Sequence, residues 1–337
     1  MEISDEHIIT TSRMKAYNAC RRLHHLKYEL GYRPVEDREA SEFGSIFHAG
    51  LEAWYLAFAK GTPLLALSAA QWAMADAAKG AVHFDEVSAA KAELLMIGYH
   101  ARWFDHMGDL EVITVEGKFT TQLPVPYGAK RARGLRVAGK LDALVRKRSD
   151  GTIWIVEHKT TSADLTPGST YWQRLRMDTQ VSVYFEGVEA LIGHAPTGCL
   201  YDVISKPQQK PYKATPVEKR KYTKGGALYA NQRAEDETMD EFKERMAAEI
   251  AAAPDAFFQR PEVVRLESEL DASRRDTYET ALMIRETGNK GLAPRNPDAC
   301  HLYNRPCDFY EVCCGAAELE DTSKFKRLDT VHPELAE

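Results

Sequence analysis

Apolar residues recur at helical spacing along the first third of the chain and again after residue 170, whereas the middle alternates with a period nearer two. The predicted helices are 13–28, 41–59, 63–78, 86–107, 171–192, 240–252 and 270–287. The predicted strands are 112–123, 138–145, 153–156, 199–204 and 263–266. Thr11-Ser12 is the expected cap of the first helix. Strands and helices in this order are typical of an α/β core.

Two of the predicted strands form a hairpin, Gly139 to Lys159, joined by an Asp-Gly turn. Side chains alternate along a strand, so Glu157 and Lys159 point to the same face. If the strands pair, Asp142 reaches that face as well. Gathering two carboxylates and a lysine at a strand end costs desolvation free energy unless a bound ion or ligand compensates it. A divalent cation would neutralise the carboxylates, and the lysine could face an anion.

Two further side chains are candidates for the same site. His48 lies four residues before Glu52 on the predicted helix 41–59, so the two share a face. His48 is either a packing histidine or an imidazole that reaches a cation held by the carboxylates. Glu116 lies on the predicted strand 112–123, where a glutamate usually faces solvent, and its role stays open.

Composition limits the class of protein. With 44% hydrophobic and 28% charged residues in 337, the chain has an ordinary globular composition. No apolar run approaches the ~18 residues that span a membrane. The polar, acidic N-terminal stretch is no secretory signal, so we expect a cytoplasmic protein with no membrane partner. Its six cysteines are then reduced thiols or metal ligands.

Three of the cysteines are clustered near residue 310. Cys300, Cys307 and Cys313 are separated by six and five residues, and clustered thiols in a cytosolic chain indicate a metal site first. Neither His301 nor Cys314 is well placed as a fourth ligand. Cys20, on the first predicted helix, is the alternative, although a lone helical cysteine is most often a small buried residue.

The net charge of −6 argues against a uniformly basic surface, but the average hides one basic segment. Residues 206–233 contain eight Lys or Arg, one Glu and three tyrosines, without a clear period. Phosphate neutralisation with base stacking would suit single-stranded nucleic acid, whereas the alternative is a solubilising surface loop. The candidate DNA-binding residues are Lys210, Lys213, Lys219, Arg220, Lys221 and Lys224.

The motifs in order resemble a known family. His48, Asp142, Glu157-x-Lys159 and Gln180-x-x-x-Tyr184 resemble the RecB-like branch of the PD-(D/E)xK nucleases. The four cysteines resemble the iron–sulfur subset of that branch, which includes the AddB nuclease domain, CRISPR-adaptation exonucleases and phage recombination exonucleases. The sequences YNACRRLHHLKYELGYRP and FGSIFHAGLEA support the match. Glu replaces the commoner Asp at 157, and the basic segment looks like an insertion.

The resemblance implies an architecture. It predicts one nuclease domain, 1–337, with a restriction-endonuclease-like core in which helices flank a mixed central sheet. Within it we expect a helical part at 41–110, a catalytic α/β core at 111–205 and a basic loop at 206–236. A C-terminal iron–sulfur segment, 295–315, would be joined to Cys20.

The resemblance also implies the site residues. His48, Asp142, Glu157 and the backbone carbonyl of His158 would bind Mg²⁺ or Mn²⁺. Lys159 would orient or deprotonate a metal-bound water, and Gln180 and Tyr184 would line the cleft and position the strand being cut. Cys20, Cys300, Cys307 and Cys313 would bind a [4Fe–4S] cluster, with a Cys₄ zinc site as the rival.

The function implied is a metal-dependent DNA exonuclease that acts on single-stranded DNA or DNA ends in phage or bacterial recombination or repair. It would work in the cytoplasm of a bacterial cell, or as a phage protein in the host cytoplasm. The resemblance implies DNA as the partner, together with a single-strand annealing protein or a helicase. The chain contains no Walker A motif, so we expect no helicase motor within it. The alternatives are a subunit of a larger DNA-processing complex and a non-catalytic iron–sulfur scaffold.

Overall fold

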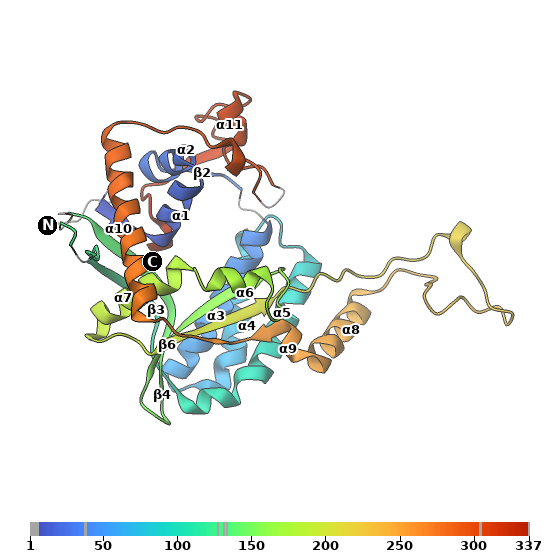
Figure 1. The fold of residues 1–337 in the computed structure, drawn as a ribbon. Coiled ribbons are helices and arrows are strands. Elements are labelled where there is room, and N and C mark those ends of the chain that lie inside the picture. The colour runs from blue at the N-terminus through green and yellow to red at the C-terminus, as the bar shows by residue number, and fades with distance from the viewer. Residues whose placement is uncertain are drawn as a thin grey trace.

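A computed structural model describes residues 7–36, 39–126, 128–130, 132, 134–302 and 305–335. Within these residues, a mixed seven-stranded sheet forms the centre of the molecule (Figure 1). β3 (Leu110–Gln122), β4 (Arg136–Lys147) and β5 (Ile153–Thr161) are antiparallel neighbours, and β6 (Gly198–Ser205) is parallel to β5. The predicted mixed sheet flanked by helices is confirmed, and it is consistent with a restriction-endonuclease-like fold.

Short strands complete the edges of the sheet. β1 (Ile8–Ile9) runs parallel to the beginning of β4. β7 (Phe258–Gln259) and β8 (Glu262–Val263) are both antiparallel to β6. The predicted strand 263–266 is therefore displaced, because only its first residue lies in β8.

The hairpin turn between β4 and β5 forms as the Asp-Gly pair predicted. Gly151 has a φ of 73°, a conformation in which residues with a Cβ are disfavoured. Asp150 Oδ1 accepts a hydrogen bond from the Thr152 N–H at 2.9 Å. These local preferences set the register of β4 against β5.

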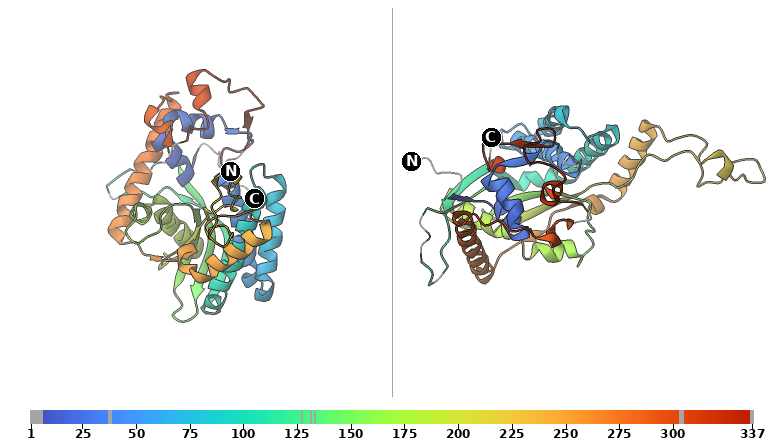
Figure 2. Two further views of the ribbon diagram at one scale, coloured as in Figure 1. Left: turned by 90° about the vertical axis from the view of Figure 1, so that its right-hand side faces the viewer. Right: turned by 90° about the horizontal axis from the view of Figure 1, so that it is seen from above.

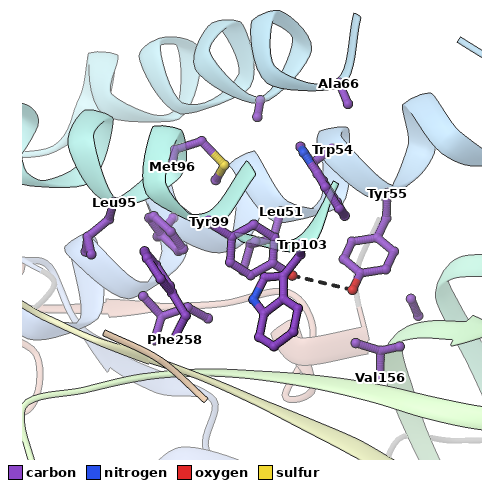
Figure 3. Close-up of a cluster of buried hydrophobic side chains, with 14 of the residues drawn as sticks. Leu51, Trp54, Tyr55, Ala66, Leu95, Met96, Tyr99, Trp103, Val156 and Phe258 are labelled. Carbon is purple, nitrogen blue, oxygen red and sulfur yellow. Dashed lines mark hydrogen bonds between the residues drawn. The ribbon is translucent and has the colours of Figure 1, made fainter. Parts of the chain in front are cut away.

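One face of the sheet is covered by α3 (Glu39–Ala59), α4 (Ala66–Ala77) and α5 (Glu86–Trp103). Figure 3 shows the packed aromatic side chains of this layer, with Trp54, Tyr55 and Tyr99 fully buried. The alanine-rich helical periods of the sequence thus predicted these elements correctly.

The opposite face is covered by α1 (Thr11–Ala19), α7 (Thr179–Ile192) and α10 (Glu267–Asn289). A Cβ added at Gly187 of α7 would lie 2.5 Å from the Phe119 ring, so this glycine lets α7 approach β3 closely. The predicted helix 171–192 is in fact two, α6 (Thr170–Leu175) and α7. The break comes before Asp178, whose side chain caps α7 by accepting from the Gln180 N–H at 2.6 Å.

The first predicted helix is also interrupted. Thr10, rather than Thr11-Ser12, caps α1, and α1 ends at Ala19. Cys20 has φ −160° and ψ 121°, which is extended backbone, so the prediction that it lies within a helix is wrong. A short helix α2 (Arg21–His24) and a π-helical turn (His25–Glu29) follow it.

Segments far apart in the sequence meet beside this turn. β2 (Tyr32–Pro34) pairs with β9 (Phe325–Arg327) in an antiparallel ribbon. Leu26, Phe309 and Phe325 form a small apolar cluster beneath it, and α11 (Tyr310–Cys314) lies nearby (Figure 1).

Residues 206–237, which we call the arm, connect β6 to α8 (Met239–Ala252). They contain a 3₁₀ turn at Val217–Lys219 and an isolated bridge between Tyr222 and Leu228. Figure 1 and the right panel of Figure 2 show the arm extending away from the body. The lack of a hydrophobic period in this segment thus predicted its irregular backbone. No helix in the described part of the chain is long and apolar enough to cross a membrane.

Candidate active site

Asp142 and Glu157 meet at the point where β4 and β5 separate. The strand pairing ends at Ala143 and Val156, and the next residue on each strand is a carboxylate. Asp142 Oδ2 accepts a hydrogen bond from the His158 main-chain N–H at 2.6 Å. The Asp142 side chain therefore takes the place of a main-chain acceptor on β4, and the sequence-based expectation that both carboxylates share this strand end is confirmed.

α7 holds Glu157 and Lys159 from one side. Lys159 Nζ forms an ion pair with Glu157 Oε1 and donates to Gln180 Oε1 at 3.2 Å. Gln180 Nε2 donates to Glu157 Oε1 at 2.7 Å and to the Tyr184 hydroxyl at 2.8 Å. Tyr184 in turn donates to the Lys140 carbonyl at 2.8 Å. The spacing of Gln180 and Tyr184 on one helical face thus brings both to the strand end.

Glu157 is the most buried acid of this group. Its side chain is 2% exposed, and its Oε2 atom has no hydrogen-bond partner in the described structure. Burial raises the pKa of Glu157 to about 7, with Asp142 adding to the rise and Lys159 opposing it. A buried carboxylate oxygen without a partner is costly, and a cation would satisfy it.

Asp142 contacts the helix-borne histidine on its other side. His48 Nδ1 on α3 lies 3.7 Å from Asp142 Oδ1. Burial alone would raise the pKa of Asp142, but His48, His158 and Lys159 hold it below its usual range. Burial also opposes the charge of His48, yet the carboxylate raises the pKa of this imidazole. His48 is therefore at the site, as its spacing on the predicted helix allowed.

The donor types suit Mg²⁺ or Mn²⁺, because carboxylate oxygens and one imidazole are ligands of these ions. In the described part of the chain, however, no three His, Cys, Asp or Glu side chains group closely enough to hold a metal ion. In this structure Glu157 is paired with Lys159 and Gln180, whereas Asp142 is paired with His48 and a main-chain N–H. The predicted ligands therefore have the right chemistry for a cation, but their side chains do not converge on a single metal position in this structure.

Glu116 also faces this region, which the sequence left open. It lies on β3 between the pairs Val115–Ala143 and Gly117–Leu141, across from Asp142, and forms an ion pair with Lys140. Burial raises its pKa, and Lys140 opposes the rise. Its φ of 53° is the one positive value found among described residues other than glycine. Such backbone conformations cluster at functional sites.

Three residues behind the site were missed entirely. His158 points to the opposite face from Glu157, where its ring contacts Asp202 and Tyr99, and Arg260 donates to Asp202. Burial alone would raise the pKa of Asp202, but Arg260 and His158 keep it below its usual range. A lone aspartate in the apolar strand CLYDVI was the available signal.

The segment around Cys20 contacts the C-terminal cysteine segment, while the four-cysteine site stays a prediction. The Asn296 N–H donates to Cys20 Sγ at 3.4 Å, across 276 positions of sequence, and the Arg22 N–H donates to the Pro294 carbonyl at 3.1 Å. Cys300, Cys313 and Cys314 line a cavity of about 730 Å³ beside Arg22. Burial raises the pKa of Cys313, and the neighbouring Cys20 and Cys300 add to the rise.

All six cysteines are free thiols. Those at positions 20, 300, 307 and 313 are half-buried, whereas Cys314 is exposed and Cys199 is buried inside the sheet. Among the described residues, these thiols too do not group closely enough to hold a metal ion.

The candidate DNA-binding residues of the arm differ in how they are used. Arg220 donates to the carbonyls of Thr215 and Ala234, at 2.9 and 2.7 Å. Lys213 pairs with Asp236 at 2.9 Å. Both side chains therefore make contacts within the arm. The exposed side chains of the set are Lys210, Lys213, Lys219, Lys221 and Lys224.

Comparison with known proteins identifies the family of this chain. No curated protein matches the chain. A solved structure titled "Crystal structure of SSO0001" is similar over 74% of this chain and 78% of its own, with 14% sequence identity; its TM-score of 0.28 is too low to support an argument. The model of the "PD-(D/E)XK nuclease superfamily" matches residues 9–313. Because that match spans nearly all of the sequence, the chain belongs to the PD-(D/E)XK nuclease superfamily.

Proposed function

We propose that this nuclease is a deoxyribonuclease of the RecB-like iron–sulfur branch. It would hydrolyse phosphodiester bonds in single-stranded DNA or at DNA ends, as an exonuclease. The observation that carries the proposal is the buried Glu157, which has one oxygen without a partner and lies beside Lys159 and Gln180 at the strand end that Asp142 shares. Members of the superfamily use divalent metals such as Mg²⁺ or Mn²⁺.

His48, Asp142, Glu157 and the carbonyl of His158 would hold the metal ion. When bound, the ion would activate a water molecule and stabilise the charge that develops on the phosphate. The imidazole ligand makes the site softer than one built from oxygens alone, which favours Mn²⁺ over Mg²⁺.

The other polar residues of the cleft would act on the substrate. The Lys159 ammonium, fixed by Glu157 and Gln180, would orient the attacking water and offset negative charge in the transition state. Gln180 and Tyr184, which are joined by a hydrogen bond, would position the strand being cut. The arm would guide single-stranded DNA, with exposed lysines for the phosphates and tyrosines for the bases.

The cysteine segment would carry a [4Fe–4S] cluster bound by Cys20, Cys300, Cys307 and Cys313. Support comes from the contact between Cys20 Sγ and Asn296, and from the electrostatic influence of Cys20 and Cys300 on the Cys313 thiol, whose pKa they help to raise. The cluster would clasp two distant parts of the chain. Zinc is the rival occupant, and the colour of the protein purified without oxygen distinguishes the two.

The test is a nuclease assay with end-labelled single- and double-stranded DNA and Mg²⁺ or Mn²⁺. We expect release of short products with Mn²⁺, and loss of about 10²–10³ in rate for Lys159→Ala. Lys118→Ala, which removes an exposed lysine from β3, is the matched control and should cut like the wild type. Full activity of both Lys159→Ala and Asp142→Ala would contradict the proposal.

A circular single-stranded substrate tests the exonuclease assignment separately. An exonuclease needs an end, so the circle should survive under conditions that degrade the linear strand. Cleavage of the circle at a similar rate would replace the exonuclease assignment by an endonuclease.

A further inference from the structure

The His158 side chain is anchored on the side of the sheet away from the cleft. Because side chains alternate along β5, His158 points toward α5 while Glu157 and Lys159 face α7. The ring is 3% exposed, and its Nδ1 atom lies 3.0 Å from Asp202 Oδ2. His158 and Asp202 are register partners on the parallel strands β5 and β6.

Asp202 is itself held by two other residues. Arg260 Nε donates to Oδ1 and Arg260 Nη2 to Oδ2, each at 3.1 Å, and the Tyr99 hydroxyl donates to Oδ2 at 2.5 Å. The guanidinium also lies over the Trp103 ring, with Cζ 4.0 Å from its centroid. Figure 3 shows Tyr99 and Trp103 in the same packed layer. Arg260 is always charged, so its partner is a carboxylate that only accepts, and the hydrogen on His158 Nδ1 points to Asp202.

This arrangement is expensive as a means of stabilising the fold. Asp202 has no exposed surface, and the Arg260 side chain is 6% exposed, so both charges lose their hydration. A buried ion pair of this kind can often be replaced by apolar residues without loss of stability. What apolar residues could not supply is a directed hydrogen bond that fixes the His158 ring.

The backbone around His158 needs such an anchor. Beyond Val156, β5 pairs with β6 on one edge but no longer pairs with β4 on the other. On that open edge the His158 N–H donates to Asp142. The ring anchor and this single bond act on the same residue, so movement of the ring would move Asp142 and the His158 carbonyl together.

We propose that Asp202 and Arg260 are positioning residues of the nuclease site. Through the His158 ring they fix the peptide groups on both sides of His158, and thereby the Asp142 carboxylate and the carbonyl offered to the metal ion. This inference rests on the proposed function and deepens it, since it assigns a role to residues that lie outside the cleft.

The first test is His158→Phe. The phenyl ring fills the space against Tyr55 and Tyr99 and leaves Asp202 with Arg260, but it cannot donate to the carboxylate. We expect Mn²⁺ affinity, measured by titration calorimetry, to fall about 10- to 100-fold, the usual effect of losing a hydrogen bond behind a ligand. kcat should fall while KM for DNA changes little. His158→Asn, whose amide nitrogen lies close to the position of Nδ1, should recover part of both losses.

A second measurement needs no metal and no activity. Hydrogen exchange followed by mass spectrometry, on the peptide that spans residues 153–161, should show faster exchange in His158→Phe than in the wild type. His100→Phe is the control, because His100 accepts from Trp54 Nε1 at 3.0 Å in the same helical layer but has no contact with Asp202. It should keep both the Mn²⁺ affinity and the exchange rate of the β5 peptide.

The outcomes separate the two proposals. A folded His158→Phe with wild-type Mn²⁺ affinity and exchange overturns the positioning role. A wild type that binds Mn²⁺ but cuts no DNA overturns the proposed function, and the affinity comparison still decides the positioning role. If the wild type binds no Mn²⁺, both are wrong. Should His158→Phe fail to fold, Arg260→Lys, which keeps the charge but loses the two-point contact, must show intermediate affinity, and wild-type affinity would refute the role.

Discussion

Glu116 lies across from Asp142 in the β3–β4 ladder with a φ of 53°, a backbone conformation that residues with a Cβ seldom adopt. The carboxylate is paired with Lys140, so the strained residue is also charged and partly buried. Strain at a site costs of order 1–3 kcal/mol and persists only where the surroundings enforce it.

We therefore predict that Glu116→Gly is more stable than Glu116→Ala by about 1 kcal/mol, although both lose the carboxylate. The difference isolates the backbone, since only glycine adopts this φ without cost. Urea denaturation followed by circular dichroism measures it. Equal stability of the two variants would mean that the positive φ is not strained in solution.

The proposed role of the arm predicts how the affinity for single-stranded DNA depends on salt concentration. Lys219, Lys221 and Lys224 are exposed near its tip, so a triple alanine variant should weaken binding to single-stranded DNA. If all three meet phosphates, the slope of log affinity against log salt should decrease by about 2, since each contact to a single strand contributes roughly 0.7.

Fluorescence anisotropy with a labelled oligonucleotide at several salt concentrations gives the slope. The control is a triple alanine variant of three lysines that lie elsewhere on the surface, Lys60, Lys79 and Lys118. An unchanged slope in the arm variant would favour the solubilising role of this segment.

The proposed cluster predicts that substitutions of the adjacent residues Cys313 and Cys314 differ in their effect on iron content. Cys313→Ser should yield colourless, iron-free protein with a lower melting temperature, because one proposed cluster ligand is lost and the clasp opens. Cys314→Ser, which changes the adjacent exposed thiol, should keep the iron and the visible absorption band. Iron analysis and absorption spectra of protein purified without oxygen provide the readout, and zinc in place of iron would correct the assignment.

Acid should weaken the segment around the π-helical turn. The hydrogen bond with His24, together with His25, lowers the pKa of Glu29 to about 2, and burial opposes this. The stability that Glu29 contributes is complete above its unfolded value near 4.5 and is lost as pH falls from there toward 2. Burial lowers the pKa of His24, so protonation of the unfolded chain below about 6.5 acts in the same direction.

The corresponding variant is Glu29→Gln, which keeps the shape of the side chain. Its melting temperature should be below that of the wild type at pH 7, and the difference should shrink as the pH falls from about 4.5 toward 2. A constant difference between them over this range would show that the charge of Glu29 does not matter.

Much of the site could be predicted because its residues lie on elements with a clear period. The alternation of side chains along β5 predicted that Glu157 and Lys159 share a face, and helical spacing predicted the same for Gln180 and Tyr184. Both pairs are in contact in the structure. What failed depends on long-range contacts. The extended backbone at Cys20 serves a meeting with Asn296, and no local pattern contains that partner.

Arg260 illustrates the same limit. It follows β7 in a short connection without periodicity, and its partner Asp202 looks like an interruption of an apolar strand. The antiparallel pairing of β6 with β7, in which Val203 lies opposite Gln259, brings them together, and no local pattern predicts that pairing. The positive φ of Glu116 was equally hidden, since glutamate has no preference that would signal it.

The pairing of β2 with β9 has a consequence for how this protein is made. The ribosome synthesises Tyr32–Pro34 long before Phe325–Arg327, so the N-terminal strand and the apolar side chain of Leu26 must wait for nearly the whole chain to emerge. Until then the N-terminal segment carries an unpaired strand edge, which is the kind of surface that aggregates or recruits chaperones. The catalytic sheet, whose main strands are complete by Ser205, could begin to assemble while that wait continues.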